Sequence, residues 1–440
     1  MMTMAADRHV LLVTDAFPPV SGGSGWSTYE LARGLRAYGA RVTVLRPRPG
    51  TPAGLRVVSD AFDRFDVHEL GGPSPPIPFV RNYVKNERLA RRLAPVVRDL
   101  VRERAIDIVH GQHLLSIPGA IAGAHAAGVP VVATIRDYWP VCYWSDLIHD
   151  RSSATLCPAC SAGMMTRCVR AHAAAIGAGA AWPAALPAIP YMRANLRWKA
   201  GRLAEADAIV AVSAVMARDL VARAPALAGR RVEVIPNPVD VATLDAAART
   251  DRPAALADIA GPYAIYVGKL AFNKGVQHLV PAALAAKLTW PLVIVGDGPD
   301  RPALEAAARG AGLDVRFTGW LDRPATLAHV AHAALLVFPS HGPESLSRVL
   351  LEAGGLGVAV AAMDTGGTRD VIVPDETGLL STSPAGLAAD VARLVADPAQ
   401  RARLGAAAQI RIRSTFATTS VVARIGALYD TLIAETRRRG

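Results

Sequence analysis

The chain has 440 residues, more than a single compact core usually holds, so we expect two domains. Hydrophobic residues make up 51% of it and aromatic residues only 5%, which indicates a globular protein whose cores consist mainly of Val, Leu, Ala and Ile. No uninterrupted stretch has the apolar quality of a membrane helix, and the amino-terminal residues show no secretion signal, so a cytoplasmic location is expected.

The charge balance favours acidic partners. Lys and Arg together number 48 against 37 Asp and Glu, a net charge of +11. Phosphorylated substrates and anionic lipid surfaces fit such an excess, and so would nucleic acid. No nucleic-acid motif accompanies the charge, so we expect no nucleic-acid partner. The basic run at residues 88–104 is most simply a helix with a solvated basic face.

Strand and helix patterns alternate along the first half of the chain. HVLLVTD (9–15) is a buried strand, a glycine loop and a helix follow it, and RVTVLRP is the next strand. This order is a β-α-β unit and predicts a parallel sheet. Further strands of this half are expected at residues 106–110, 129–135, 206–213 and 232–236.

The pattern restarts after a linker at residues 237–262. Strands are expected at residues 263–268, 291–296, 315–319, 334–340 and 358–363. Two doubly wound, Rossmann-like α/β domains in tandem are the economical interpretation. We place the first domain at residues 1–240, with an insert at about 138–200, and expect the amphipathic helix 418–440 to join it. The second domain is residues 241–417.

Open parallel sheets bind ligands beyond the carboxyl ends of their strands, so the loops there are the candidate sites. The loop AFPPVSGGSGWS brings the backbone N–H groups of Gly22 and Gly23 to the start of a helix, where an anion can bind. It lacks the spacing of a dinucleotide fingerprint, and a flexible turn is the alternative. The loop GKLAFNKG carries Lys269 and Lys274, which could neutralise a diphosphate or be ordinary surface lysines.

The stretch HGPESLSRVLLEA holds two glutamates eight positions apart, Glu344 and Glu352. On a helix they would be separated by a rise of about 12 Å and by about 80° around the axis. That arrangement suits an extended ligand better than the close carboxylate pair of a glycosidase. Carboxylates bind sugar hydroxyls, so a lysine loop together with this glutamate loop describes a nucleotide sugar. A capped helix with one solvated glutamate is the alternative.

Several motifs in the same order carry a family resemblance. YVGKLAFNKGVQHLV, LVIVGDGP, PESLSRVLLEA, DTGGTRDVI and ETGLL resemble the retaining, nucleotide-sugar-dependent glycosyltransferases of family 4. The resemblance implies the GT-B fold, with two Rossmann-like domains that face each other across a cleft. The first domain would bind the acceptor and the second the donor.

The activity implied by the resemblance is retaining transfer of a hexose from a UDP- or GDP-linked sugar to a hydroxyl acceptor. A lipid-linked or cell-envelope glycan and a small glycoside are the acceptors considered. No metal would be needed for catalysis, since lysines would neutralise the diphosphate. Two alternatives stay open from the sequence: a non-catalytic sugar-nucleotide or lipid-surface binding protein, and a GT-B fold sugar-nucleotide epimerase.

The resemblance also implies residue roles. Glu344 would contact the transferred sugar, and Glu352 would hold the ribose. The remaining donor contacts would come from Lys269, Lys274, the backbone of Gly22, Gly23, Ser345 and Leu346, and, near the base, Trp320 and Leu321. We expect substitution of either glutamate to leave folding intact, because neither carboxylate is expected to support the core.

The chain departs from the family pattern after its fourth parallel strand. TIRDYWP has Arg136 where many members carry a histidine, so Arg136 is a candidate for stabilising the diphosphate. His110 and His113, in VHGQHLL, are candidate acceptor contacts, although each could equally be a hydrogen-bonded loop histidine.

The insert raises two further expectations. Its four cysteines, the only ones in the chain, are Cys142, Cys157, Cys160 and Cys168, and they are candidates for a structural zinc site, with plain reduced thiols as the alternative. The alanine- and proline-rich stretch 171–191 reads as a loop or interfacial segment. The net charge of +11 and the stretch WPAALPAIPYMRANLRWK (182–199) could place the first domain on or near an anionic membrane surface.

Overall fold

The computed structural model describes residues 8–19, 22–58, 62–150, 156–175, 177 and 179–439. The chain forms two compact units, each considered by itself below. The first unit consists of Met1–Ser145, Pro158–Pro238 and Thr418–Gly440, and the second of Asp146–Cys157 and Val239–Ala417.

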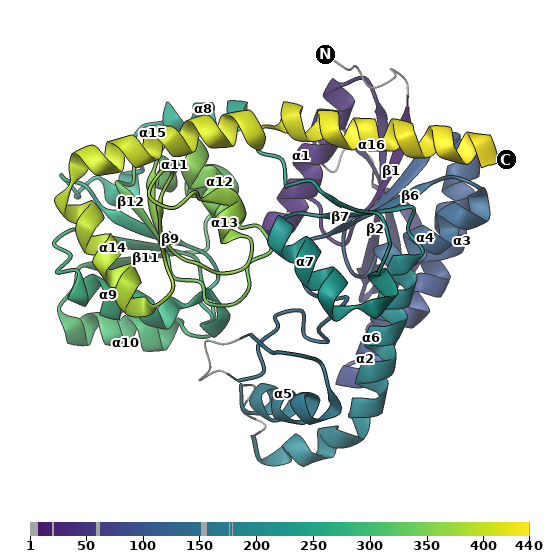
Figure 1. Cartoon of the computed structure of the whole chain (residues 1–440), viewed down its shortest axis with the longest axis horizontal. Helices are drawn as coiled ribbons and strands as arrows, with labels where there is room; N and C mark the ends of the chain where they lie inside the picture. The colour runs from purple at the N-terminus through teal and green to yellow at the C-terminus, as the bar shows by residue number, and fades with distance from the viewer. Residues whose placement is uncertain are drawn as a thin grey trace. The chain divides into compact units, whose positions relative to one another are not determined.

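The first unit is built on an eight-stranded sheet in the order β3-β4-β2-β1-β5-β6-β7-β8 (Figure 1). Its strands are β1 (His9–Val13), β2 (Arg41–Pro49), β3 (Thr51–Val58), β4 (Asp66–Gly72), β5 (Ile108–Gly111), β6 (Val131–Ile135), β7 (Ala208–Ala211) and β8 (Val232–Val234). All neighbours pair in parallel except β3, which runs antiparallel to β4 at the sheet edge. The expected parallel sheet is confirmed, whereas β3 and β4 were not expected.

Helices cover both faces of this sheet. They are α1 (Gly23–Ala37), α2 (Pro78–Tyr83), the π-helix η1 (Val84–Arg88), α3 (Leu89–Arg104), α4 (Ile117–Ala127), α7 (Ala214–Arg223), the 3-10 turn η3 (Pro225–Leu227) and α16 (Thr418–Arg439). Helix α16 packs on α1, and its apolar side chains join those of β1, β2, β5, β6 and β7 in one buried cluster. At Gly34 of α1 a Cβ would lie 2.5 Å from side-chain atoms of Thr418 and Val422, so the two helices approach closely. The carboxyl-terminal helix is therefore part of the first unit's core.

The insert is more helical than its composition suggests. Helix α5 (Ala162–Ala175), the 3-10 helix η2 (Gly179–Ala188) and α6 (Ile189–Ala204) project from the sheet of the first unit (Figure 1). They have a small apolar core of their own, with Tyr143, Met165 and Met192 buried in it. The expectation of a loop at 171–191 was therefore wrong, because the prolines of this stretch are accommodated in the 3-10 helix and in the first turn of α6.

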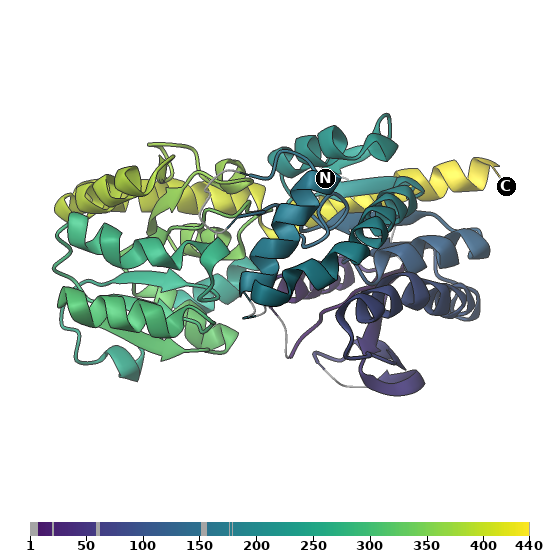
Figure 2. The ribbon, with the colours of Figure 1, turned by 90° about the horizontal axis from the view of Figure 1, so that it is seen from below.

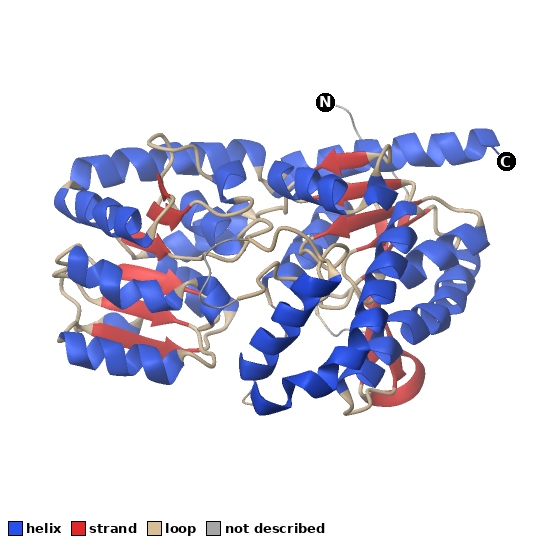
Figure 3. Ribbon diagram, turned by 60° about the horizontal axis from the view of Figure 1, so that its bottom comes forward, coloured by secondary structure: helices blue, strands red, loops and turns tan. Residues whose placement is uncertain are grey.

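The second unit has a six-stranded, all-parallel sheet in the order β11-β10-β9-β12-β13-β14. Its strands are β9 (Ala264–Val267), β10 (Leu292–Val295), β11 (Val315–Gly319), β12 (Leu335–Phe338), β13 (Ala359–Met363) and β14 (Leu379–Ser381). This is the doubly wound order in which the chain starts in the middle, builds outward, and then crosses to the other side. The near-continuous apolar strands, such as LVIV and LLVF, suit a sheet that helices cover on both faces, as Figure 3 shows.

The helices of the second unit lie in two layers around that sheet (Figure 2). They are α8 (Val241–Ala248), α9 (Leu279–Ala285), α10 (Arg301–Ala311), α11 (Arg323–Ala331), α12 (Arg348–Gly355), α13 (Thr368–Val371), α14 (Pro384–Ala396) and α15 (Pro398–Thr415), with 3-10 turns η4 (Ala254–Leu256), η5 (Phe272–Lys274) and η6 (Val276–His278). No helix in the described part of the chain is both long enough and apolar enough to be a membrane span.

Both units therefore contain a topological switch point, where strand order reverses and neighbouring loops diverge. In the first unit it lies between β1 and β5, and in the second between β9 and β12. Ligands of open α/β sheets bind outside the carboxyl ends of the strands at such points. The side chains that follow these four strands are accordingly the first to examine.

Candidate functional site

The switch point of the second unit joins the lysine loop to the first glutamate. Lys274 Nζ lies 2.6 Å from Glu344 Oε1, and Ser340 Oγ donates to the same oxygen at 2.6 Å. Lys274 comes from the loop after β9, whereas Ser340 and Glu344 follow β12. The Glu344 side chain is 10% exposed and that of Lys274 is 35% exposed, so the pair lies at the boundary between core and solvent.

Two glycines press these loops together. Gly275 has φ of +70°, and a Cβ there would lie 1.8 Å from the carbonyl oxygen of Pro339. Gly366 has φ of +50°, and a Cβ there would lie 2.2 Å from the carbonyl oxygen of Glu344. Any side chain would therefore push the loops apart. The backbone N–H of Gly367 donates to that carbonyl at 2.6 Å, which fixes Glu344 from the other side.

Glu344 does not stand on a helix. Helix α12 begins only at Arg348, so Glu344 lies in the loop before it, whereas Glu352 lies on the helix. Ser345 is half-buried and Leu346 is buried between the glutamate and the helix. The separation calculated for two residues of one helix therefore does not apply.

Glu352 is held by two arginines that sequence reasoning missed. Its Oε1 accepts from Arg348 Nε at 2.8 Å and lies 3.2 Å from Arg323 Nη2. The three side chains are only 8% to 9% exposed. Arg348 is one helical turn before Glu352, a spacing visible in the sequence, but Arg323 comes from the start of α11. Glu352 is therefore part of a buried group of charged side chains, and the effect of its substitution on folding stays a prediction.

The other donor-side residues are more exposed. The Trp320 indole, in the turn between β11 and α11, is 70% exposed, and Leu321 beside it is half-buried. Lys269 is exposed, and its backbone carbonyl accepts from the Tyr266 hydroxyl at 3.0 Å. Burial and the Glu344 charge raise the pKa of Tyr266, so this phenol stays neutral. The structure leaves the Lys269 and Trp320 side chains accessible to a ligand of the second unit.

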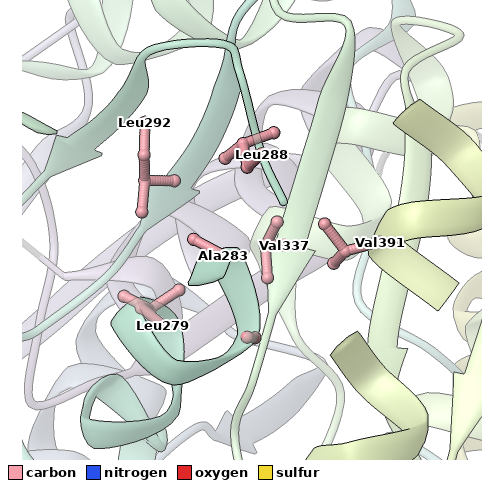
Figure 4. A pocket seen from close by; sticks show the side chains of 7 residues that line it. Leu279, Ala283, Leu288, Leu292, Val337 and Val391 are labelled. Atoms are coloured by element: carbon pink, nitrogen blue, oxygen red, sulfur yellow. The ribbon is translucent and has the colours of Figure 1, made fainter. Parts of the chain in front are cut away.

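A small cavity elsewhere in the second unit is a packing feature. It holds about 10 Å³, room for about one water molecule, and its lining is apolar (Figure 4). The lining residues are Leu279, Ala282, Ala283, Leu288, Leu292, Val337 and Val391. It offers no polar group and is too small for a sugar or nucleotide.

In the first unit, Gly22 and Gly23 are exposed at the start of α1, with Gly22 as the N-cap. Arg136 follows β6 and is buried. Its Nε donates to Asn237 Oδ1 at 2.9 Å and its Nη1 to the carbonyl of Gln112 at 3.0 Å. Two of the guanidinium donors therefore hold loops of the first unit together.

The two candidate histidines differ sharply. His110 is fully buried, with Nδ1 2.5 Å from Tyr429 Oη and Nε2 2.6 Å from Thr134 Oγ1. Both ring nitrogens are thus used inside the core, which is the hydrogen-bonded alternative and leaves no atom for an acceptor. His113 Nδ1 lies 3.0 Å from Thr14 Oγ1, while its buried Nε2 has no hydrogen-bond partner in the described chain. Burial lowers the pKa of both histidines, and the Arg136 charge adds to the effect.

The four cysteines of the predicted zinc site belong to the insert and the loop before it. Cys142 is buried after β6, while the other three are half-buried. Cys168 Sγ lies 3.9 Å from Nδ1 of His172, one turn further along α5. The described residues, which include all four thiols, contain no group of three or more His, Cys, Asp or Glu side chains able to hold a metal ion. The structural zinc site therefore stays a prediction.

Comparisons with known proteins agree with this architecture. Residues 21–243 match the family described as Glycosyltransferase Family 4, and residues 261–397 match Glycosyl transferases group 1. A glycogen synthase of Mycobacterium tuberculosis is 28% identical over 445 aligned positions, which cover 96% of this chain and 94% of that protein.

Solved structures show the same fold. The sucrose-phosphate synthase of Thermosynechococcus elongatus superimposes with a TM-score of 0.70 at 20% identity, covering 97% of this chain and all (100%) of that one. The Anabaena protein HepE in complex with UDP-glucose gives a TM-score of 0.64 at 18% identity, with 96% and 99% covered. With its two Rossmann-like units of GT-B type and a family match over half its length, the chain belongs to glycosyltransferase family 4.

Proposed function

We propose that this glycosyltransferase moves a hexose, with retention of configuration, from a UDP- or GDP-linked sugar to a hydroxyl acceptor. A lipid-linked or cell-envelope glycan or a small glycoside is the acceptor class. The observation that carries the proposal is the group Lys274, Glu344 and Ser340 at the switch point of the second unit. A cation beside a carboxylate complements the two parts of a sugar diphosphate, its negative phosphates and its hydroxyl groups, and this supports the proposal.

The roles follow from the chemistry of each group. Glu344 accepts hydrogen bonds from hydroxyls of the transferred sugar, and the Lys274 ammonium faces the diphosphate, with Lys269 as a second cation. The exposed face of Trp320, with Leu321, suits the base. The backbone of Ser345 and Leu346 supports the sugar and diphosphate, that of Gly22 and Gly23 the diphosphate, and Glu352 the ribose. Arg136 stays a candidate for diphosphate stabilisation.

In the proposed step the bond between the anomeric carbon and the diphosphate oxygen breaks. The acceptor oxygen bonds to the same carbon on the same face, and the acceptor proton passes to the leaving diphosphate. Stabilisation of the departing charge by the lysines is then the main catalytic contribution of the protein. Lysines fill the part that a divalent ion would otherwise take, so turnover is metal-independent.

The test is incubation of the full chain with a panel of UDP- and GDP-sugars, with and without EDTA, scored for nucleotide release and for the anomeric configuration of the product by NMR. Retention and full activity in EDTA are expected. An inverted product would contradict retention, and loss of turnover in EDTA would contradict metal independence.

We also propose peripheral contact of the first unit with anionic membrane, through the insert. Exposed Arg193 and Arg197 stand on α6 next to the exposed prolines of η2 and the half-buried Trp182. Such a surface would bind weakly and reversibly. Each arginine near the lipid phosphates would contribute about 1 kcal/mol to the free energy of binding. Co-sedimentation with phosphatidylglycerol vesicles at low salt should therefore fall for Arg193→Ser/Arg197→Ser, and a lack of binding by the wild type contradicts the contact.

A further inference from the structure

We infer that Tyr266 is a positioning residue for the diphosphate of the donor: its buried hydroxyl holds the turn that carries Lys269, and so sets how tightly the second unit binds a nucleoside diphosphate. Tyr266 lies on β9, a strand at the switch point of the second unit, and the turn at residues 268–271 follows that strand. The inference rests on the proposed function, because it takes Lys269 as one of the two cations that face the diphosphate.

The carrying observation is a hydrogen bond between the core and the lysine loop. Tyr266 is 2% exposed and belongs to the buried apolar cluster of the second unit. Its hydroxyl donates to the backbone carbonyl of Lys269 at 3.0 Å, and the same carbonyl accepts from the backbone N–H of Ala271 at 3.0 Å. A carbonyl oxygen has two lone pairs, so these two bonds use both of them. The Lys269 peptide group is therefore fixed by the phenol from the side of the core.

Two glycines show that the turn fits closely around this phenol. A Cβ at Gly268 would lie 2.8 Å from Tyr266 Oη, so the hydroxyl occupies the space that a side chain would need. A Cβ at Gly296, the residue after β10, would lie 2.0 Å from the carbonyl oxygen of Gly268. The backbone N–H of Gly268 also donates to the carbonyl of Val295 at 3.0 Å. The turn is therefore held between the Tyr266 hydroxyl and the end of β10.

The Lys269 ammonium depends on this anchor because its side chain has no other one within the described chain. Lys269 is exposed, and its side chain forms no hydrogen bond or ion pair with the residues that the structure describes. Lys274 differs, because its ammonium lies 2.6 Å from Glu344 Oε1. A lysine side chain is a flexible four-carbon stem, so its fixed point is its own peptide group. Loosening that peptide spreads the ammonium over more positions, and the cost of ordering it on a phosphate rises.

The phenol also keeps its donor role when the ligand binds. Burial, together with the nearby Glu344 carboxylate, raises the pKa of Tyr266 above its ordinary value of 10.0. A diphosphate brings further negative charge to this end of the sheet, which acts in the same direction. The Tyr266 hydroxyl therefore stays protonated and continues to donate to the Lys269 carbonyl in the complex.

The test compares Tyr266→Phe with Tyr263→Phe in the full chain. Tyr263, the residue before β9, is the matched control because it is also buried and its hydroxyl donates to a backbone carbonyl, that of His329, at 2.5 Å. His329 lies on α11, so the control removes the same kind of bond away from the lysine loop. Circular dichroism checks that both variants are folded.

Calorimetry measures the affinity of each variant for UDP and GDP. UMP and GMP, which lack the second phosphate, are measured by competition against the diphosphate. Lys269→Ala and the double variant Tyr266→Phe/Lys269→Ala complete a double-mutant cycle, which reports whether Tyr266 acts through Lys269. A purely structural role of the phenol would weaken both kinds of nucleotide and would not depend on Lys269.

The affinity for the better-bound nucleoside diphosphate should fall about fivefold in Tyr266→Phe, the effect expected of one neutral hydrogen bond. The affinity for its monophosphate should stay unchanged, as should both affinities in Tyr263→Phe. In the Lys269→Ala background, Tyr266→Phe should cause no further loss.

The inference is overturned if the two phenylalanine variants bind the diphosphate alike, if diphosphate and monophosphate weaken together, or if the effects of Tyr266→Phe and Lys269→Ala are additive. These outcomes leave the proposed function standing. The proposed function fails instead if the wild type neither binds UDP or GDP nor releases nucleotide from the sugar panel, and that result overturns the inference as well.

Discussion

The same strand reversal occurs in both units, but the polar side chains there are paired in the second unit and partly unpaired in the first. Between β9 and β12, Lys274 and Ser340 converge on Glu344 and satisfy it. Between β1 and β5, Asp15, Gln112 and His113 keep buried atoms without partners. Charged side chains near solvent, such as Lys274 and Glu344, can stay paired until a ligand replaces one partner. Polar atoms in the dry interior cost more free energy when they lack a partner, so the unpaired atoms of the first unit are the costly ones.

The largest expected effect is on stability, and it comes from breaking the ion pairs of Glu352 in the second unit. Glu352→Ala removes a buried carboxylate that contacts both Arg348 and Arg323. Breaking a buried ion pair in this way costs about 3 to 5 kcal/mol. Urea unfolding followed by circular dichroism should show that loss. The exposed Glu376→Ala is the control and should stay within about 0.5 kcal/mol of the wild type. Equal stability of Glu352→Ala and Glu376→Ala would show that the arginines find other partners.

The second prediction removes the charged group at the centre of the paired site. Under the proposed function Glu344 bonds to the transferred sugar, and those bonds strengthen as the diphosphate departs, so Glu344→Ala should lower kcat by about 10² to 10³. Nucleotide affinity should survive, since the Lys274 ammonium stays in the loop after β9. Steady-state kinetics and calorimetric nucleotide titration separate the two quantities. Full turnover by Glu344→Ala would mean that the carboxylate only holds the lysine.

Sequence reasoning predicted the paired site better than the unpaired one, for a physical reason. Lysines and glutamates at strand ends are conspicuous, and Lys274 and Glu344 do meet. The predicted strands of both sheets also formed, because continuous apolar runs have few other ways to be buried. Asp15 and Gln112 attracted no attention, since an isolated acid or amide after a strand has no motif; only burial without partners distinguishes them.

Where tertiary contacts decide, the sequence was silent or misleading. His110 and His113 looked alike, yet Tyr429, more than three hundred residues away in sequence, takes up one nitrogen of His110. The helix expected to carry both glutamates begins only at Arg348, and the partner Arg323 comes from another helix. The strand pair β3 and β4 escaped notice because β3 is exposed along most of its length and lacks an apolar face.

The last prediction concerns the stability cost of the buried Asp15 carboxyl group in the first unit. Burial raises the pKa of Asp15 to about 7, against an ordinary value of 3.8, with the nearby Asp137 adding to the shift and hydrogen bonds from Leu115 and Ser116 opposing it. Between about pH 4 and pH 7 the folded chain therefore holds a proton on Asp15 that the unfolded chain releases. The free energy of unfolding therefore falls as pH rises through this range, and the full cost of the buried carboxylate is present above pH 7.

Asp15→Asn cannot ionise, and its amide can still accept from the Leu115 N–H. At pH 8 it should be more stable than the wild type by about 2 kcal/mol, less than the full pKa shift implies because a buried amide also lacks a partner. The gain should shrink as the pH falls toward 5. Urea unfolding at pH 8, 7, 6 and 5 measures it, with Gln400→Leu as the pH-independent control. A gain in stability at pH 8 would show that the buried Asp15 carboxylate costs stability at that pH. A pH-independent difference would show instead that Asp15 does not ionise in the folded chain, and the two switch points would then differ in packing alone.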